Sequence, residues 1–181
     1  MFYPNFSPFP KFTTRRFILR EINEGDASLI HKLRSDQETN ALIGREKSNS
    51  IADALLFINR IKSTVSRNEG IYWVISFQNV SDLVGTIGYW NFNLSAETAE
   101  IGYELLTEFR RQGIMTEVLP GIIRFGFEEM NLKLITAFSS EQNIGSVKLL
   151  EKSGFQLSSS DYYNSEEYLP GMLKFVLQNP Q

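Results

Sequence analysis

A polar stretch at residues 107–117 carries the side chains best suited to binding an anion. Arg110 and Arg111 precede Gly113, which stands where a strand and loop give way to a helix. The first N–H groups of a helix lack partners and carry partial positive charge, and a glycine lets a ligand approach the backbone. With Thr116 in the first turn, the stretch predicts a pyrophosphate site, although ordinary strand–helix junctions also tolerate a turn glycine and surface arginines.

A second segment, residues 141–155, has the form of a strand exit followed by a short helix. Asn143 is expected to cap this helix, and Gly154 is expected to end it. Ser146, in the first turn of this helix, would then be an ordinary surface residue. The two segments at this separation are more specific than either one alone.

These segments resemble those of the GNAT acetyltransferases, and within them the RimJ/RimL-type branch. The resemblance covers roughly residues 14–177 and rests on three pieces. They are a fourth strand, a pyrophosphate loop and a second cofactor motif: Ala99-Glu100-Ile101-Gly102-Tyr103-Glu104-Leu105, Arg110-x-x-Gly113-x-Met115, and Asn143-x-x-Ser146-x-x-Leu149-Leu150-Glu151-Lys152-x-Gly154-Phe155. The last piece is the most specific.

The resemblance implies an α/β (α+β) GNAT acyl-CoA acyltransferase fold, with a mixed, twisted sheet of about seven strands flanked by about four helices. It also implies acetyl-CoA as co-substrate and no metal. The positions that it carries over as cofactor contacts are Leu105, Leu106, Arg110, Arg111, Gln112, Gly113, Ile114, Met115, Thr116, Asn143 and Ser146.

Two positions depart from the family pattern. Met115 stands where the strict loop has a small residue, so its side chain must point away from the phosphates; the RimJ/RimL-type branch is similar in admitting Met. Leu150 stands where many members have a Tyr that protonates the CoA thiolate. The resemblance to the RimJ/RimL type then makes Ser146 the candidate for stabilising that thiolate.

The reaction that the resemblance implies is direct attack of a neutral amine on the acetyl thioester, with a backbone N–H on the fourth strand as oxyanion donor. Glu100, Gly102 and Glu104 alternate and therefore share one face of a strand. Glu100 is the candidate base, directly or through a water, and Ser146 is the second candidate catalytic residue. Both glutamates could instead be solvated or paired with arginines.

The acceptor site is expected near the first two helices and the last hairpin. Its aromatic candidates, which could also be ordinary sheet packing, are Tyr89, Trp90, Phe92, Tyr162, Tyr163 and Tyr168. The acidic residues Asp161, Glu166 and Glu167 could attract a cationic acceptor or form a solvated loop. His31, the one histidine, is expected to be structural, and without cysteines a metal site is not expected.

Hydrophobic periodicity predicts the elements that hold these segments. Strands are expected at 17–22, 71–77, 83–92, 98–106, 132–139, 155–159 and 173–177, and helices at 27–34, 50–68, 111–130 and 144–153. Residues 37–48 show no clear period. Residues 1–13 are expected to form an arm whose rings pack on a single GNAT domain, residues 14–181.

The bulk composition excludes several classes. The absence of cysteine excludes a disulfide scaffold and a Cys nucleophile. A net charge of −3 and the lack of a long apolar run indicate a cytoplasmic protein that binds neither nucleic acid nor membrane. The sequence is compatible with a monomer or a homodimer. We therefore expect an N-acetyltransferase acting on a protein N-terminal amine, such as that of a ribosomal protein, or on a small amine. The alternatives are a GNAT-like CoA-binding module with little or no catalysis and a pure interaction domain.

Overall fold

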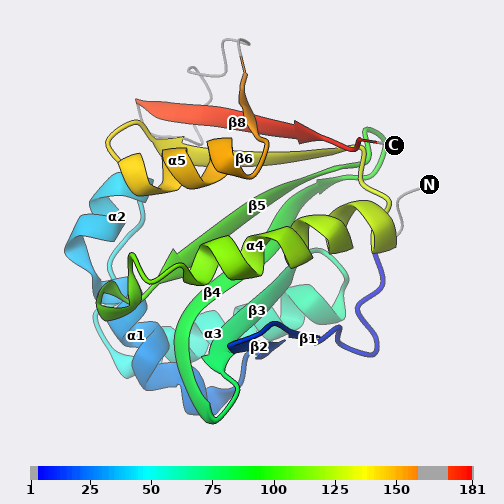
Figure 1. Ribbon diagram of the computed structural model, residues 1–181. Helices are drawn as coiled ribbons and strands as arrows, with labels where there is room; N and C mark the ends of the chain where they lie inside the picture. The colour runs from blue at the N-terminus through cyan, green and yellow to red at the C-terminus, as the bar shows by residue number, and fades with distance from the viewer. Residues whose placement is uncertain (1–3, 159–170, 181) are drawn as a thin grey trace.

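A computed structural model describes residues 4–158 and 171–180, and its centre is one mixed sheet of eight strands (Figure 1). The order across the sheet is β1-β2-β3-β4-β5-β6-β8-β7, and only the β5–β6 pair is parallel. The strands are β1 (Phe12–Thr13), β2 (Phe17–Glu21), β3 (Ile71–Phe77), β4 (Val80–Asn93), β5 (Thr98–Leu105), β6 (Leu134–Ser140), β7 (Gln156–Leu157) and β8 (Met172–Gln178). The expected mixed sheet is confirmed, with the two-residue β1 as the additional strand.

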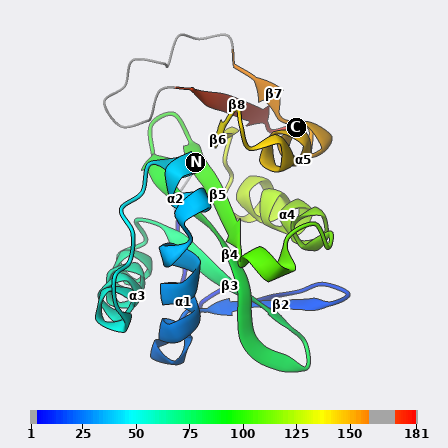
Figure 2. The same ribbon diagram turned by 90° about the vertical axis from the view of Figure 1, so that its left-hand side faces the viewer.

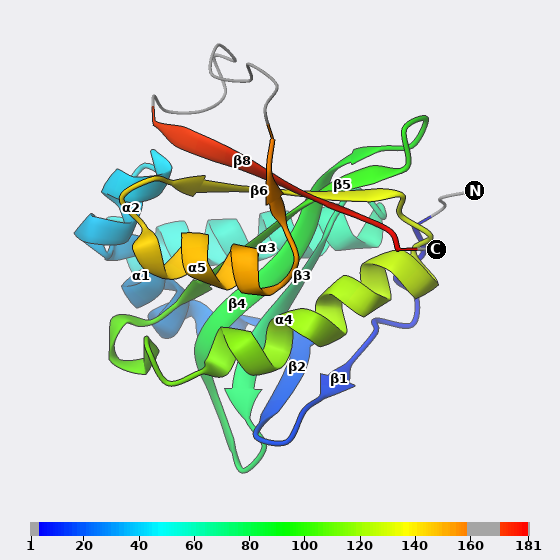
Figure 3. The ribbon, with the colours of Figure 1, turned by 45° about the horizontal axis from the view of Figure 1, so that its top comes forward.

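Helices cover both faces of the sheet (Figure 2). The helices are α1 (Ala27–Ser35), α2 (Gln37–Ile43), α3 (Ile51–Ser66), α4 (Ile114–Arg124) and α5 (Ile144–Lys152). In Figure 3, α4 and α5 lie in front of the sheet and α3 lies behind it. The helix expected at 111–130 is shorter, because Arg110–Gly113 form a turn and residues 125–129 continue α4 as a π-helical turn.

Two apolar clusters fill the space between the sheet and its helices. On one side, α4 packs against the sheet through a cluster that includes Trp73 and Ile122, both fully buried. On the other side, α1 and α3 pack against Val74 and Leu83. Consecutive residues of a strand point to opposite faces, which is why Trp73 and Val74 belong to different clusters.

The N-terminal arm packs on the α4 side, as its aromatic content predicts. Phe6 is 4% exposed, and the rings of Phe9 and Phe12 contact the Trp73 indole, whose Nε1 donates to the Pro10 carbonyl at 2.7 Å. The arm ends in β1, which pairs with β2. Residues 12 and 13 therefore belong to the sheet.

The strands β5 and β6 separate along their length (Figure 1). Their pairing consists of Thr98 with Leu134, Ala99 with Ile135, and Glu100 with Thr136. Beyond Glu100, β5 remains paired with β4, and β6 remains paired with β8. We call the divergence between residues 101–105 of β5 and residues 137–140 of β6 the β5–β6 fork. The starts of α4 and α5 lie at its open end.

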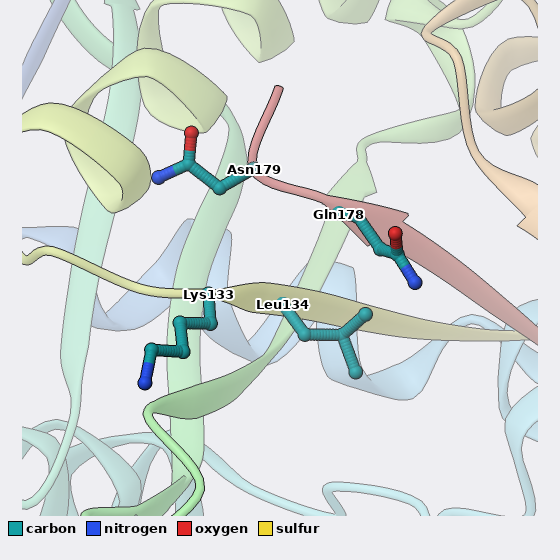
Figure 4. A pocket seen from close by; sticks show the side chains of 4 residues that line it. All are labelled: Lys133, Leu134, Gln178 and Asn179. Atoms are coloured by element: carbon teal, nitrogen blue, oxygen red, sulfur yellow. The ribbon is translucent and has the colours of Figure 1, made fainter. Parts of the chain in front are cut away.

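A pocket at the opposite, paired end of these strands is lined by Lys133, Leu134, Gln178 and Asn179 (Figure 4). Leu134 is the partner of Thr98 in β5, so this pocket lies away from the fork. Among the helices of the described ranges, none is long and apolar enough to cross a membrane.

Candidate active site

The start of α4 offers backbone donors for an anion. Gly113 is its N-cap at φ 72°, in the left-handed region that favours glycine, and no described side chain caps this end. The Glu117 N–H donates to the Gly113 carbonyl at 3.2 Å as the helix begins. The N–H groups that precede Glu117 lie in the first turn, where an α-helix supplies no internal acceptor. This end of α4 can therefore receive the predicted pyrophosphate.

The side chains of this first turn follow the prediction for the loop. Ile114 is 1% and Met115 is 7% exposed, and both pack into the α4-side core. The Met115 side chain therefore points away from a bound phosphate, as expected, and both residues can contribute only their backbone. Thr116 is exposed, so its hydroxyl is accessible at the same end.

The two arginines of the loop differ in their surroundings. The Arg110 guanidinium donates to Asp36 Oδ1 at 3.1 Å and to Thr39 Oγ1 at 2.6 Å, which connects the loop to the start of α2. Burial alone would raise the pKa of Asp36, but hydrogen bonds from Thr39 and Arg110 lower it to about 2. Arg111, at φ 61°, is exposed. Arg110 thus shares its charge with a carboxylate, whereas Arg111 faces solvent.

Gln112, also exposed, donates its side-chain amide to the Glu108 carbonyl at 2.8 Å. A third cation at this loop is Arg16, which lies just before β2 and was not among the residues expected from the sequence. Its Nη1 donates to the Gln112 carbonyl at 3.2 Å, and its Nε lies 2.6 Å from Glu117 Oε2. No sequence signal places Arg16 there, because about a hundred residues separate it from the loop.

The backbone N–H and C=O groups of β5 point alternately toward β4 and toward the fork. The Leu106 N–H donates to the Val84 carbonyl of β4 at 3.0 Å. Because backbone groups of a strand alternate in direction, those of Tyr103 and Leu105 point toward the fork. Leu105 therefore has backbone groups available to a ligand in the fork, and its contact with a cofactor stays a prediction. Leu106 is 3% exposed and its N–H is already used, so the structure does not support it as a polar contact.

The candidate base, Glu100, lies on the face of β5 that is turned toward α1 and α3. Glu100 is 8% exposed, and its Oε2 accepts a hydrogen bond from Asn91 Nδ2 at 2.9 Å. The Trp90 indole lies against Gly102, where an added Cβ would come within 2.2 Å of the ring. Glu100 and Trp90 are thus neighbours on the face that α1 and α3 cover.

Glu104 lies on the same face but has a different role. Both of its carboxylate oxygens accept from Arg45, at 2.5 and 2.9 Å. Arg45 also donates to Asn40 in α2. The expectation that a glutamate of this strand pairs with an arginine thus holds for Glu104, which connects β5 to α2.

The start of α5 brings together the two residues of the second motif. Asn143 caps the helix, since its Oδ1 accepts from the Ser146 N–H at 3.2 Å; its side-chain NH₂ is a further donor for a cofactor. Ser146 Oγ lies 3.0 Å from the hydroxyl oxygen of Tyr103 in β5. Leu150 is 1% exposed and packs in the core. Ser146 and Tyr103 therefore each bring a hydroxyl to this end of the fork.

Of the aromatic acceptor candidates, Trp90 alone among the described residues lies on the Glu100 face. Tyr89 is completely buried on the α4 side, where its hydroxyl donates to the Ile122 carbonyl at 3.0 Å. Phe92 packs on the ring of Phe6 in the same core. Neither residue lines the Glu100 face: strand alternation turns Tyr89 away, and the irregularity at Asn91, whose φ is 51°, turns Phe92 away. Tyr162, Tyr163, Tyr168, Asp161, Glu166 and Glu167 lie outside the described residues.

His31 is partly exposed, and its Nδ1 lies 2.9 Å from Ser48 Oγ, as a structural histidine should. Within residues 4–158 and 171–180, no three His, Asp or Glu side chains form a group that could hold a metal ion.

Comparisons with known proteins identify the family of this chain. Residues 16–156 match the acetyltransferase (GNAT) domain family. The uncharacterized N-acetyltransferase YoaA of Bacillus subtilis is 35% identical over 148 residues, 82% of this chain and 84% of the relative. The uncharacterized N-acetyltransferase p20 of Bacillus licheniformis is 27% identical, over 91% of this chain and 93% of its own length.

Solved structures share the fold at lower identity. Mycobacterium smegmatis RimJ in complex with CoA-disulfide has a TM-score of 0.79 at 19% identity, covering 94% of this chain and 89% of that one. The ribosomal-protein-S5-alanine acetyltransferase of Vibrio fischeri has a TM-score of 0.78 at 21% identity, covering 95% and 98%. The solved structures that share this fold therefore include members of the RimJ/RimL type. The chain belongs to the GNAT family of acetyltransferases and is an acyltransferase.

Proposed function

We propose that the protein transfers the acetyl group of acetyl-CoA to a primary amine, through a single direct attack. The observation that carries the proposal is the start of α4 at the open end of the β5–β6 fork, with Gly113 as a cap of positive φ and no described side-chain cap. Such a helix end accepts a pyrophosphate, and the fork leaves room for an extended chain beside β5.

The residues present fit acetyl-CoA as the donor. The N–H groups from Gly113 to Thr116 suit the pyrophosphate, with Arg16 and Arg111 as nearby cations. The backbone groups of Leu105 suit the amides of the pantetheine arm. The NH₂ group of Asn143 is a further donor at the start of α5.

The proposed mechanism has the amine on the Glu100 side of β5 and the sulfur on the Ser146 side. In our proposal Glu100 takes the amine proton, directly or through one water, as the nitrogen attacks the thioester carbonyl. A fork-facing N–H of β5 donates to the oxyanion. The carbon–sulfur bond then breaks with its electron pair on sulfur, and the Ser146 hydroxyl donates a hydrogen bond to that thiolate.

For the acceptor we propose a protein N-terminal amine or a small primary amine, handled in the cytoplasm. The Vibrio fischeri structure is described as a ribosomal-protein-S5-alanine acetyltransferase, and a Vibrio cholerae structure with a TM-score of 0.78 as a putative ribosomal-protein-serine acetyltransferase. The Trp90 indole beside Glu100 supports an amine on this face, because an aromatic ring attracts a cation.

One observation favours a second candidate, a CoA-binding protein with little catalysis. Leu150 is buried where many members of the family have a catalytic tyrosine. The two candidates differ in turnover. An enzyme of the proposed mechanism loses turnover in Glu100→Gln but still binds acetyl-CoA, whereas a CoA-binding protein shows little turnover even when unmodified.

Calorimetric titration tests the binding of acetyl-CoA, which both candidates require. The test variant is Thr116→Glu. Glutamate is tolerated at an exposed first-turn position and adds negative charge where the pyrophosphate would lie. We expect binding to weaken at least tenfold. Gly121→Glu is the matched control, because it adds the same charge to the same helix with nothing within 4 Å of the new Cβ. Absence of binding to the unmodified protein, or equal weakening by both variants, contradicts the assignment.

A further inference from the structure

The contact between Tyr103 and Ser146 joins β5 to α5 across the β5–β6 fork. The two oxygens lie 3.0 Å apart, although 43 residues separate them in sequence. The backbone of Tyr103 points toward the fork, and its ring lies on the side of α4 and α5. Both parts of Tyr103 thus lie where the thioester is expected.

The chemistry of the two hydroxyls assigns a direction to this hydrogen bond. Burial raises the pKa of Tyr103 to about 12, an effect that the bond to Ser146 partly opposes. The phenol is therefore neutral at working pH and keeps its proton. A phenol is a stronger acid than an aliphatic alcohol, so Tyr103 is the better donor and Ser146 Oγ the acceptor. The proton of Ser146 is then available to a third atom.

Other contacts already hold α5 in place. Leu150 packs in the core, Val147 packs against it, and Asn143 caps the helix. The Tyr103–Ser146 bond is therefore not needed to anchor α5. The bond instead orients the Ser146 hydroxyl at the place where negative charge would develop on sulfur. Because this hydroxyl also accepts a hydrogen bond from Tyr103, it is polarised and becomes a stronger donor.

We propose that Tyr103 is a positioning residue: its phenol donates to Ser146 Oγ and so directs the Ser146 proton to the sulfur of CoA as the carbon–sulfur bond breaks. The inference rests on the proposed function. Tyr103 transfers no proton in this step. The electron pair of the broken bond stays on sulfur, the amine proton leaves through Glu100, and the thiolate takes a proton from solvent after release.

The test needs no acceptor amine, because free CoA already carries the sulfur. The ultraviolet absorbance of the thiolate gives the pKa of the thiol of bound CoA, and a free thiol titrates near ~8.5. We expect a lower value on the unmodified protein. Ser146→Ala should raise that value by about one unit and Tyr103→Phe by about half a unit, as expected for hydrogen bonds to a charged group. The double variant should match Ser146→Ala alone, because Tyr103 acts through Ser146.

Tyr72→Phe is the matched control, because it removes a buried phenol on the opposite face of the sheet, where Tyr72 packs against Phe57. It should leave the thiol pKa unchanged. An unchanged value in Tyr103→Phe, or additive shifts in the double variant, overturns the inference while the proposed function stands. Failure of the unmodified protein to bind CoA overturns both.

Discussion

At the scale of single residues, two glutamates of one strand face have different environments. The carboxylate of Glu104 is occupied by a bidentate pair with Arg45, with both side chains less than a fifth exposed. Glu100 accepts instead from the neutral amide of Asn91. An amine would have to compete with the Arg45 guanidinium for the oxygens of Glu104. Glu104 is therefore a poor candidate for contacting the amine.

Exchange of each glutamate for glutamine should consequently affect different properties. Glu100→Gln should lower kcat about 10²- to 10⁴-fold, as expected for loss of a general base, with the affinity for acetyl-CoA unchanged. Glu104→Gln should instead lower the free energy of unfolding by about 1–3 kcal/mol, because it leaves Arg45 without its carboxylate partner. Steady-state kinetics, calorimetry and thermal unfolding measure the three quantities. A Glu100→Gln enzyme with normal kcat would exclude Glu100 as the base, whereas an unmodified protein that binds acetyl-CoA without measurable turnover would favour the CoA-binding candidate.

The sequence predicted the local roles of single residues better than their contacts with residues far away in the chain. The capping of α5 by Asn143 and the inward direction of Met115 follow from local rules. The requirement for glycine at 102 has another cause, since it comes from the Trp90 indole of the adjacent strand. Contacts such as that of Tyr103 with Ser146 depend on how β5 and α5 are placed, which no local pattern encodes.

At the scale of elements, the start of α4 is tied to the segment between β1 and β2. Glu117 Oε1 accepts from Thr14 Oγ1 at 2.7 Å and from the Arg16 N–H at 2.8 Å, and Oε2 accepts from Arg16 Nε. Burial alone would raise the pKa of Glu117, but these hydrogen bonds and the Arg16 charge lower it below its usual value. The carboxylate thus holds the N-terminal end of α4, where we propose that the pyrophosphate binds, against the first strands.

This tie should appear in the pH dependence of stability. Because the pKa of Glu117 is lowered in the folded state, its contribution is fully present above the unfolded value of ~4.3 and is lost as the pH falls toward the folded value. We expect the free-energy difference between the unmodified protein and Glu117→Gln, measured by urea unfolding, to shrink below about pH 4. Glu128→Gln, which changes an exposed glutamate, is the control. A difference that does not change with pH would contradict this role of Glu117.

The element that sequence reasoning missed, α2, shows why periodicity fails for short helices. Residues 37–43 have too few apolar side chains to display a face. Polar contacts stabilise the helix instead: Asp36 caps it by accepting from the Thr39 N–H, and Asn40 binds Arg45. The longer elements α3, β3 and β5 were predictable, because each presents a regular apolar pattern to the core.

At the scale of the whole molecule, β5 and β6 join the two parts of the sheet through only three residue pairs, Thr98 to Glu100. The sequence predicted a mixed sheet but not where the register of the parallel β5–β6 pair ends, because register depends on the packing of α4 and α5 on one face. A donor bound beside β5 would complete the interrupted ladder. This arrangement connects the fold directly to cofactor binding.

Completion of the ladder should be visible in hydrogen exchange, residue by residue along β5. The amides of Tyr103 and Leu105 point toward the fork and should exchange more slowly once acetyl-CoA is bound. The amides of Gly102 and Glu104 point toward β4 and should be protected already, with little change. Exchange monitored by NMR with and without acetyl-CoA resolves the four positions. Uniform protection of all four would indicate general rigidification of β5, and no change at Tyr103 and Leu105 would mean that the donor does not lie in the fork.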